Sequence, residues 1–277
     1  MELLKRLFNF YLNSSIHVAL SAFALTWVTL IEYDLEYKKN MLYFVFFASI
    51  TGYNFVKYFG LAKFHHRSLA NWLKVIQLFS LIAFLLMSYY FLLLKLSSML
   101  YVIALAIITF LYSIPLIPRR YVLDEQQKLR DIGGLKVYVI ALVWMLTTVI
   151  LPLIENDKSL NTDVLITSMQ RFCFIIVLML PFEIRDLNYD SLKLSTIPQK
   201  IGVKRTKICG VLLLMVFMML EFFKDELSTI TVVSTLIIVF VTLLFLIFSH
   251  KNQSKYYSAF FVESLPVVWL IVLLVLC

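Results

Sequence analysis

The sequence predicts an all-α, polytopic membrane protein, a helical bundle of about nine transmembrane helices around a central lipid-accessible cavity. Its composition is the first observation that predicts this class. Hydrophobic residues make up 61% of the 277 positions and charged residues 15%, against about 45–50% and about 25% in a soluble domain. A soluble globule of this size has too little interior for so many apolar side chains, so lipid must be the solvent for most of them.

Apolar segments of spanning length are the second observation. A transmembrane helix needs about 17–25 mostly apolar residues, and nine segments of the chain are candidates. In order they cover residues 14–31, 41–60, 72–94, 97–117, 134–154, 164–183, 208–223, 228–248 and 256–276. The seventh is short, and its connection to the eighth is tight enough for an antiparallel helical hairpin. Nothing is left over for a soluble domain, so residues 1–277 are expected to form a single transmembrane domain.

The basic residues supply the third observation. With these spans, 19 of the 25 Lys and Arg residues fall on the side of the amino terminus, five fall on the other side, and Arg171 lies inside a span. Because basic loops stay in the cytoplasm, we expect a cytoplasmic amino terminus and a carboxyl terminus on the opposite side. The formal charge of +8 is spread over short loops, which favours membrane lipids over nucleic acid as the partner.

Polar residues concentrate in three loops on the predicted cytoplasmic face, at about residues 57–71, 118–133 and 184–207. In the third loop, Asp186 and Asp190 are four residues apart and share one face if the sixth helix continues through them. Like charges at this spacing repel, and magnesium is the cation that takes carboxylates together with phosphate oxygens. The alternative is a solvated helix end, whose acids pair with neighbouring basic residues such as Arg185.

A family resemblance emerges at this loop. The run Arg185-Asp186-x-x-x-Asp190, followed by the residues 195–198 and by Gly202, resembles the second aspartate motif of the UbiA-type intramembrane prenyltransferases. The segment Leu111-Tyr112-Ser113, followed by Pro115, Arg119 and Arg120, is similar to the tyrosine–serine segment of that family. The layout of about nine helices, with motif loops after the second and sixth spans, also agrees.

The resemblance implies transfer of a polyprenyl group from an isoprenoid diphosphate to a lipid-soluble acceptor in the membrane. It implies that Asp186 and Asp190 are catalytic and hold one magnesium ion, and that Arg185 is catalytic. It also implies a set of residues that bind the substrate, namely Asn54, Lys57, Tyr112, Arg119 and Lys193.

The first aspartate motif of the family is degenerate in this chain. Asn54 fits its asparagine, but the acidic positions are occupied by Phe55, Tyr58 and Ala62, and no carboxylate occurs between residues 36 and 124. Basic residues of this loop, such as Lys57, are hypothetical substitutes for the missing metal ions. A second function therefore stays open, a non-catalytic membrane protein that binds a lipid or isoprenoid after losing the first metal site. A transporter is a third reading, but the sequence shows no repeats or broken helix pairs.

Two ionisable residues, Arg171 and Glu263, lie inside predicted spans, about seven residues from an end. Charged groups at this depth are costly and often functional. Each either lines the central cavity, pairs with a polar neighbour or reaches back to the interface.

Overall fold

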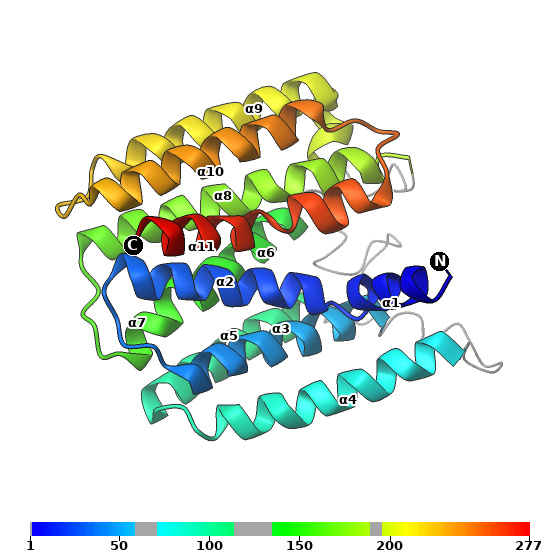
Figure 1. Ribbon diagram of the computed structural model, residues 1–277, viewed down its shortest axis with the longest axis horizontal. Coiled ribbons are helices and arrows are strands. Elements are labelled where there is room, and N and C mark those ends of the chain that lie inside the picture. Colours follow the sequence, from blue (N-terminus) through cyan, green and yellow to red (C-terminus); the bar gives the residue numbers. More distant parts are fainter. Residues whose placement is uncertain (1, 59–70, 114–134, 189–195) are drawn as a thin grey trace, which may run out of the picture.

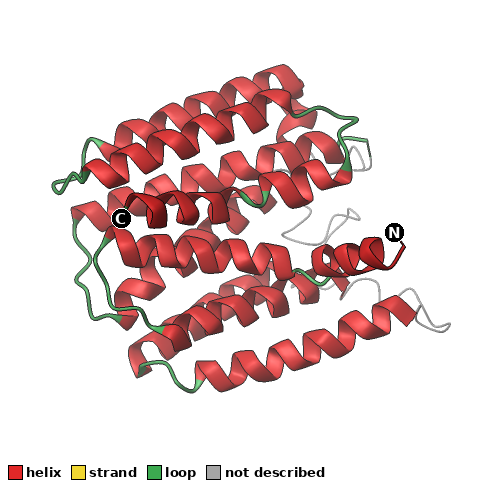
Figure 2. Ribbon diagram, viewed as in Figure 1, coloured by secondary structure: helices red, strands yellow, loops and turns green. Residues whose placement is uncertain are grey.

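The computed structural model describes residues 2–58, 71–113, 135–188 and 196–277. Every regular element in these ranges is a helix (Figure 2), which confirms the all-α class. The elements are α1 (Glu2–Asn13), α2 (Ile16–Glu32), α3 (Lys39–Tyr58), α4 (Asn71–Phe91), α5 (Leu96–Ser113), α6 (Leu135–Met145), the π-helical turn η4 (Leu146–Ile150), α7 (Leu151–Glu155), α8 (Thr162–Asp186), α9 (Ile197–Glu221), α10 (Thr229–Phe248), the π-helical turn η6 (Tyr257–Val262) and α11 (Leu265–Leu276).

The long helices run along one common direction and reverse at each connection (Figure 1). Helix α8 packs against α6 and α9, and α2 packs against α3 and α11. The two termini lie at opposite ends of the bundle. We call the end that carries the amino terminus, the end of α3 and the end of α8 the amino-terminal end, and the other the far end. Which of them faces the cytoplasm stays a prediction.

Five helical segments of the described residues are long and apolar enough to cross a membrane, so the chain is a multi-pass membrane protein. They are Trp72–Phe91, Leu135–Glu155, Thr162–Asp186, Thr229–Phe248 and Tyr257–Leu276. The pair formed by α1 and α2 counts as a sixth if it is one bent span. Helices also overlap the other predicted spans, but they do not meet this test, and the number of nine spans stays a prediction.

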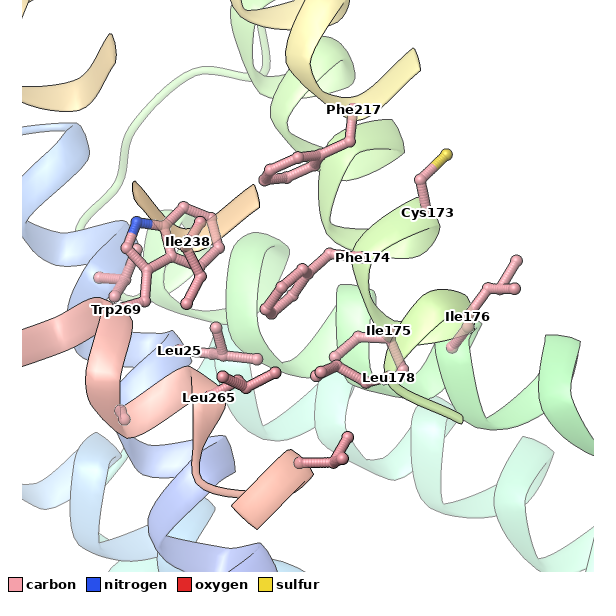
Figure 3. Close-up of a cluster of buried hydrophobic side chains, with 14 of the residues drawn as sticks. Leu25, Cys173, Phe174, Ile175, Ile176, Leu178, Phe217, Ile238, Leu265 and Trp269 are labelled. Carbon is pink, nitrogen blue, oxygen red and sulfur yellow. The ribbon is translucent and has the colours of Figure 1, made fainter. Parts of the chain in front are cut away.

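An aromatic cluster forms the centre of the largest core. The ring centroids of Phe174 and Phe217 lie 5.6 Å apart, and the indole of Trp269 meets Phe174 edge-on at 5.3 Å. Figure 3 shows these rings closing the space between α8, α9 and α11, with Ile238 and Leu25 beside them. Such aromatic pairs add about 0.5–1.5 kcal/mol each to the stabilisation from burial, so this cluster fixes the position of α8 in the bundle.

The first predicted span, 14–31, corresponds to helix α2 (Ile16–Glu32), but a further helix that was not predicted, α1, precedes it from Glu2. The two helices meet at Ser14 and Ser15, where the chain turns by 54°. Ser15 has a φ of 62°, in the left-handed region, so the break is a sharp elbow. Helix α1 is short and amphipathic, which a search for long apolar segments does not detect.

The start of α9 also differs from the prediction. The long loop expected over 184–207 is shorter, because α8 runs to Asp186 and α9 begins at Ile197. Gln199 accepts a hydrogen bond from the backbone N–H of Thr196 at 3.0 Å, and Pro198 occupies the first turn, both features of a helix start. Gly202 has a φ of 79° and kinks the helix, a conformation that glycine adopts without strain.

Candidate functional site

The last turn of α8 places the predicted Arg185 and Asp186 at the amino-terminal end. The Nε and Nη2 atoms of Arg185 both lie 2.7 Å from Oδ1 of Asp186. The same guanidinium donates from Nη1 to Oγ of Ser258 in η6 at 2.9 Å, and it lies over the ring of Phe182 at 5.5 Å. Both side chains keep about a quarter of their surface exposed, 21% for Arg185 and 25% for Asp186. They are therefore accessible to a ligand from that end.

The predicted pairing of Asp186 with Asp190 on one helical face required α8 to continue past Asp186. In the structure, the helix ends at Asp186. Residues 187 and 188 form a turn, and the side-chain amide of Asn188 donates to the carbonyl of Lys251 at 3.1 Å and to Oδ1 of Asn252 at 3.2 Å. These contacts hold the chain against the loop between α10 and η6. Asp190, Lys193 and Arg119 lie outside the described residues, and so does the side chain of Tyr112.

The predicted residues of α3 meet the elbow between α1 and α2. Asn54 is buried; its Oδ1 accepts from Oγ of Ser15 at 2.8 Å, and its Nδ2 donates to the carbonyl of Ser14 at 3.0 Å and to Oγ of Ser80 at 2.8 Å. Lys57 donates from Nζ to the carbonyl of Asn13 at 3.2 Å. Both residues thus have partners within the protein, and both lie at the same end as Asp186.

The described donor atoms do not complete a magnesium site. Within the described ranges no group of three or more His, Cys, Asp or Glu side chains is close enough to hold a metal ion. The carboxylate of Asp186 lies at the expected position, but it is shared with Arg185. The described residues therefore supply one of the two predicted ligands, while Asp190 falls outside them, as do Asp124 and Asp131.

A small, mostly apolar pocket of about 30 Å³ lies between α3, α6, α8 and the start of α11. Its lining consists of Tyr53, Ile140, Trp144, Ile175, Leu178, Met179, Phe182, Glu263 and Pro266. Phe182 connects it to the amino-terminal end, because the guanidinium of Arg185 lies over the Phe182 ring. The pocket is therefore an apolar space with the Arg185–Asp186 pair at its rim, the arrangement expected of the central cavity.

Tyr53 and Glu263 are the groups that bring oxygen atoms into this lining. The Tyr53 hydroxyl accepts a hydrogen bond from Nε1 of Trp144 at 2.8 Å. The sequence singles out Glu263 by its depth in a span, but it gives no sign of Tyr53 and Trp144. The two residues are 91 positions apart in the chain and come from different helices. No local sequence pattern predicts such a contact.

The second intramembrane charge, Arg171, faces a separate cluster toward the far end. Its side chain is 1% exposed; it donates to the carbonyl of Leu25 and to Oγ1 of Thr29, both at 3.2 Å, and lies 3.6 Å from Oε2 of Glu32. Its guanidinium carbon is 4.9 Å from the ring centre of Trp269. Arg171 therefore pairs inside the bundle instead of lining the pocket or reaching the interface.

No known protein family matches the sequence, and neither does any curated protein. Solved structures do match the fold. One is the apo structure of a UbiA homologue from Aeropyrum pernix K1, with a TM-score of 0.65 and 13% identity over 94% of this chain and 97% of that one.

Two further structures agree. A UbiA homologue from Archaeoglobus fulgidus, bound to GPP and Mg²⁺, has a TM-score of 0.64 and 14% identity over 96% of this chain and 99% of that one. A structure of digeranylgeranylglyceryl phosphate synthase has a TM-score of 0.56 and 14% identity over 98% of both chains. The similarity spans nearly the whole chain. At 13–14% identity it establishes a shared fold and nothing about activity. This protein has the fold of the UbiA homologues, as the motif around Asp186 indicates.

Proposed function

We propose that this protein transfers a polyprenyl group from an isoprenoid diphosphate to a lipid-soluble acceptor in the membrane. One observation carries the proposal, namely the place of Arg185 between the carboxylate of Asp186 and Phe182 in the pocket lining. An isoprenoid diphosphate has a charged head and an apolar tail, and the charged rim and the apolar lining of the pocket correspond in chemistry to these two parts. The UbiA-type fold supports it, since the homologue from Archaeoglobus fulgidus binds GPP and Mg²⁺.

The role of Arg185 in this reaction follows from its charge. When the allylic carbon–oxygen bond breaks, negative charge gathers on the leaving diphosphate, and a fixed cation at that place stabilises it. Lys57 lies at the same end and adds a second positive charge. A magnesium ion held by Asp186 and Asp190 would supply further neutralisation when bound. The proposal also keeps Lys193, Arg119 and Tyr112 as contacts of the diphosphate.

A non-catalytic isoprenoid-binding protein is the second candidate, and the first-motif region favours it. This region has no carboxylate in the sequence, and its predicted substrate ligands, Asn54 and Lys57, bond to the elbow and to α4. A protein that has lost one set of metal ligands retains a pocket and one charged rim. This arrangement suffices for binding, whereas ionisation needs more charge stabilisation.

One experiment separates the two candidates. GPP binding to detergent-purified protein is measured with and without Mg²⁺, and diphosphate release is followed in the presence of a membrane lipid extract. The variants are Asp186→Asn and Asp190→Asn, and the matched control is Asp157→Asn, an exposed carboxylate at the far end that pairs with Lys95.

We expect Mg²⁺-dependent binding that weakens about tenfold or more in both variants and stays unchanged in the control, because charge-assisted contacts contribute about 1.5–3 kcal/mol each. Diphosphate release identifies a transferase, and binding without release identifies the non-catalytic protein. Absence of GPP binding under every condition would overturn both.

A further inference from the structure

Helix α1 leaves three leucines exposed at the amino-terminal end of the bundle. Leu3, Leu4 and Leu7 are 72%, 74% and 58% exposed, and they share one face of the helix because residues three and four apart are neighbours. Lys5 and Arg6 lie toward the other side, and both are exposed. The helix is therefore amphipathic, with an apolar face that the rest of the described chain leaves largely uncovered.

The other contacts of α1 fix it to the bundle. The carbonyl of Asn13, its last residue, accepts from Nζ of Lys57 at 3.2 Å and from the hydroxyl of Tyr58 at 2.8 Å. On the side of η6, the ring of Phe8 meets the ring of Phe260 edge-on, with the centroids 5.2 Å apart. Helix α1 therefore has one orientation in the bundle, and its leucines are exposed in that orientation.

The length of α2 places α1 at the surface of the membrane. Helix α2 has 17 residues, which is about 26 Å at about 1.5 Å per residue, and the hydrocarbon core is about 30 Å thick. Helix α2 thus nearly crosses the core alone, and the turn of 54° directs α1 away from the axis of that span. A short amphipathic helix at such a place rests in the interface, with its apolar face toward the acyl chains and its charged face among the headgroups.

The charge of this end complements an anionic surface. Exposed basic side chains of the described chain gather there, namely Lys5, Arg6, Lys57, Lys74, Lys200, Lys204, Arg205, Lys251 and Lys255. The described acidic side chains of the same end, Glu183, Asp186 and Glu263, are buried or half-buried, and the sequence of α1 contains one acid, Glu2. Basic residues beside a membrane attract anionic lipids, so the phosphates of such lipids are the complementary partner.

One of these basic residues contacts α1 from another element. Lys255, in the loop before η6, donates from Nζ to Oδ1 of Asn9 at 3.3 Å, and Tyr256 donates to the same oxygen at 3.0 Å. Asn9 lies one turn after Lys5 on the polar side of α1. The polar side of the helix and the loop before η6 therefore form one basic surface.

We propose that α1 binds the anionic lipid layer of the membrane at the amino-terminal end. Its three exposed leucines insert between the acyl chains, while Lys5, Arg6 and Lys255 contact lipid phosphates. The partner is thus an anionic phospholipid such as phosphatidylglycerol, and the inference does not depend on the proposed function. Tyr58, at an acidic position of the degenerate first motif, serves here to hold α1 in place.

The depth of α1 is measured on the full chain in nanodiscs that hold one copy each. The three free cysteines are replaced by serine, and a nitroxide label is attached to Leu4→Cys or to Lys5→Cys, which lie on different sides of the helix. Access of oxygen and of a water-soluble nickel complex reports the depth. We expect the label at position 4 to lie among the acyl chains and the label at position 5 among the headgroups. Equal access of the nickel complex to both labels would overturn the insertion.

The choice of lipid is measured with a bimane fluorophore on Leu4→Cys in the same background. Its quenching by brominated phosphatidylglycerol is compared with quenching by brominated phosphatidylcholine. We expect a preference for phosphatidylglycerol of about fivefold or more, the scale of one basic residue near an anionic surface. Lys5→Gln/Arg6→Gln should lose most of this preference. The control Lys39→Gln/Lys158→Gln changes two exposed lysines of the far end and should keep it.

Salt gives the same test without a substitution of the basic residues, should the double variant unfold. The preference should decrease in 1 M NaCl, where the Debye length is about 3 Å. Equal quenching by the two lipids, or a preference that Lys5→Gln/Arg6→Gln leaves unchanged, would overturn the inference. So would spin–spin coupling between labels at position 4 in discs that hold two copies, because a second copy of the chain would then cover the leucines.

Discussion

At the scale of single residues, Arg171 shows how the bundle accommodates a charge inside the membrane. It is among the largest fully buried side chains of the described residues, and its partners are Glu32, Thr29 and Trp269. Nearby, Gln170 donates to Oε2 of Glu221 at 2.8 Å. The polar groups therefore join α2, α8 and α9 toward the far end, away from the pocket. We interpret Arg171 as a structural residue.

Replacing Arg171 tests this interpretation. Arg171→Met removes the cation that pairs with the buried carboxyl group of Glu32, so we expect the free energy of unfolding to fall by about 3–5 kcal/mol, as for other broken buried pairs. Denaturant unfolding in micelles measures it. The double variant Arg171→Met/Glu32→Met removes both charges and should recover much of the loss, while Lys158→Met in an exposed turn should have no effect. If Arg171→Met were as stable as the control, the pair would contribute nothing.

The same two residues show how much of the site is visible in a sequence. The high cost of a charge in lipid identifies both Arg171 and Glu263. Their opposite settings, an ion pair and an apolar pocket, depend on partners from other helices, such as Glu32 and Tyr53. Asp186 and Arg185 could be predicted because they are part of a local motif. The bond from Arg185 to Ser258, 73 residues away, could not.

At the scale of elements, Asn54 connects three helices. Its amide bonds to the elbow between α1 and α2 and to Ser80 of α4. We expect Asn54→Ala to lower the free energy of unfolding by about 2–3 kcal/mol, because each lost hydrogen bond contributes about 1 kcal/mol and its former partners stay buried. Thermal unfolding in detergent measures the change.

The matched control for Asn54 is Thr51→Ala, one turn earlier on α3. Thr51 donates only to the carbonyl of Phe47 in its own helix, so its removal should have a much smaller effect. GPP binding is measured with both variants. If Asn54→Ala lost GPP binding but kept full stability, the structural role of Asn54 in connecting the three helices would be wrong. The substrate contact predicted from the sequence would then be favoured.

The helices could be predicted where contact with lipid requires a long apolar run of residues. Long apolar runs such as 228–248 and 256–276 lie in helices of the structure. The prediction fails where polar contacts decide. The elbow at Ser15 is held by hydrogen bonds from Asn54 and Ser15. The early start of α9 at Ile197 depends on the cap at Thr196, and Gly202 kinks the helix beyond it. Hydropathy does not register these features.

At the scale of the whole molecule, polar chemistry is divided between the two ends of the bundle. The amino-terminal end carries Arg185 and Asp186, beside the pocket that Phe182 and Glu263 line. The far end carries the cluster of Arg171 and Glu221. The aromatic core of Phe174 lies between the two. On the proposed function, one end binds the ligand, and the other fixes the helices that hold it.

The orientation of these ends leads to the last prediction. The basic loops predict that the amino-terminal end faces the cytoplasm, and a soluble diphosphate would then enter from there. Cys173, Cys209 and Cys277 are free, and replacing all three by serine gives a background for single cysteines. Lys251→Cys lies in the turn after α10, and Lys158→Cys in the turn before α8; both positions are exposed.

In right-side-out vesicles, a membrane-impermeant maleimide should label Lys158→Cys and spare Lys251→Cys, and inside-out vesicles should give the reverse. Labelling of both positions from one side would contradict a bundle that spans the membrane. An inverted pattern would place the Arg185–Asp186 rim outside the cell and would contradict entry of the diphosphate from the cytoplasm.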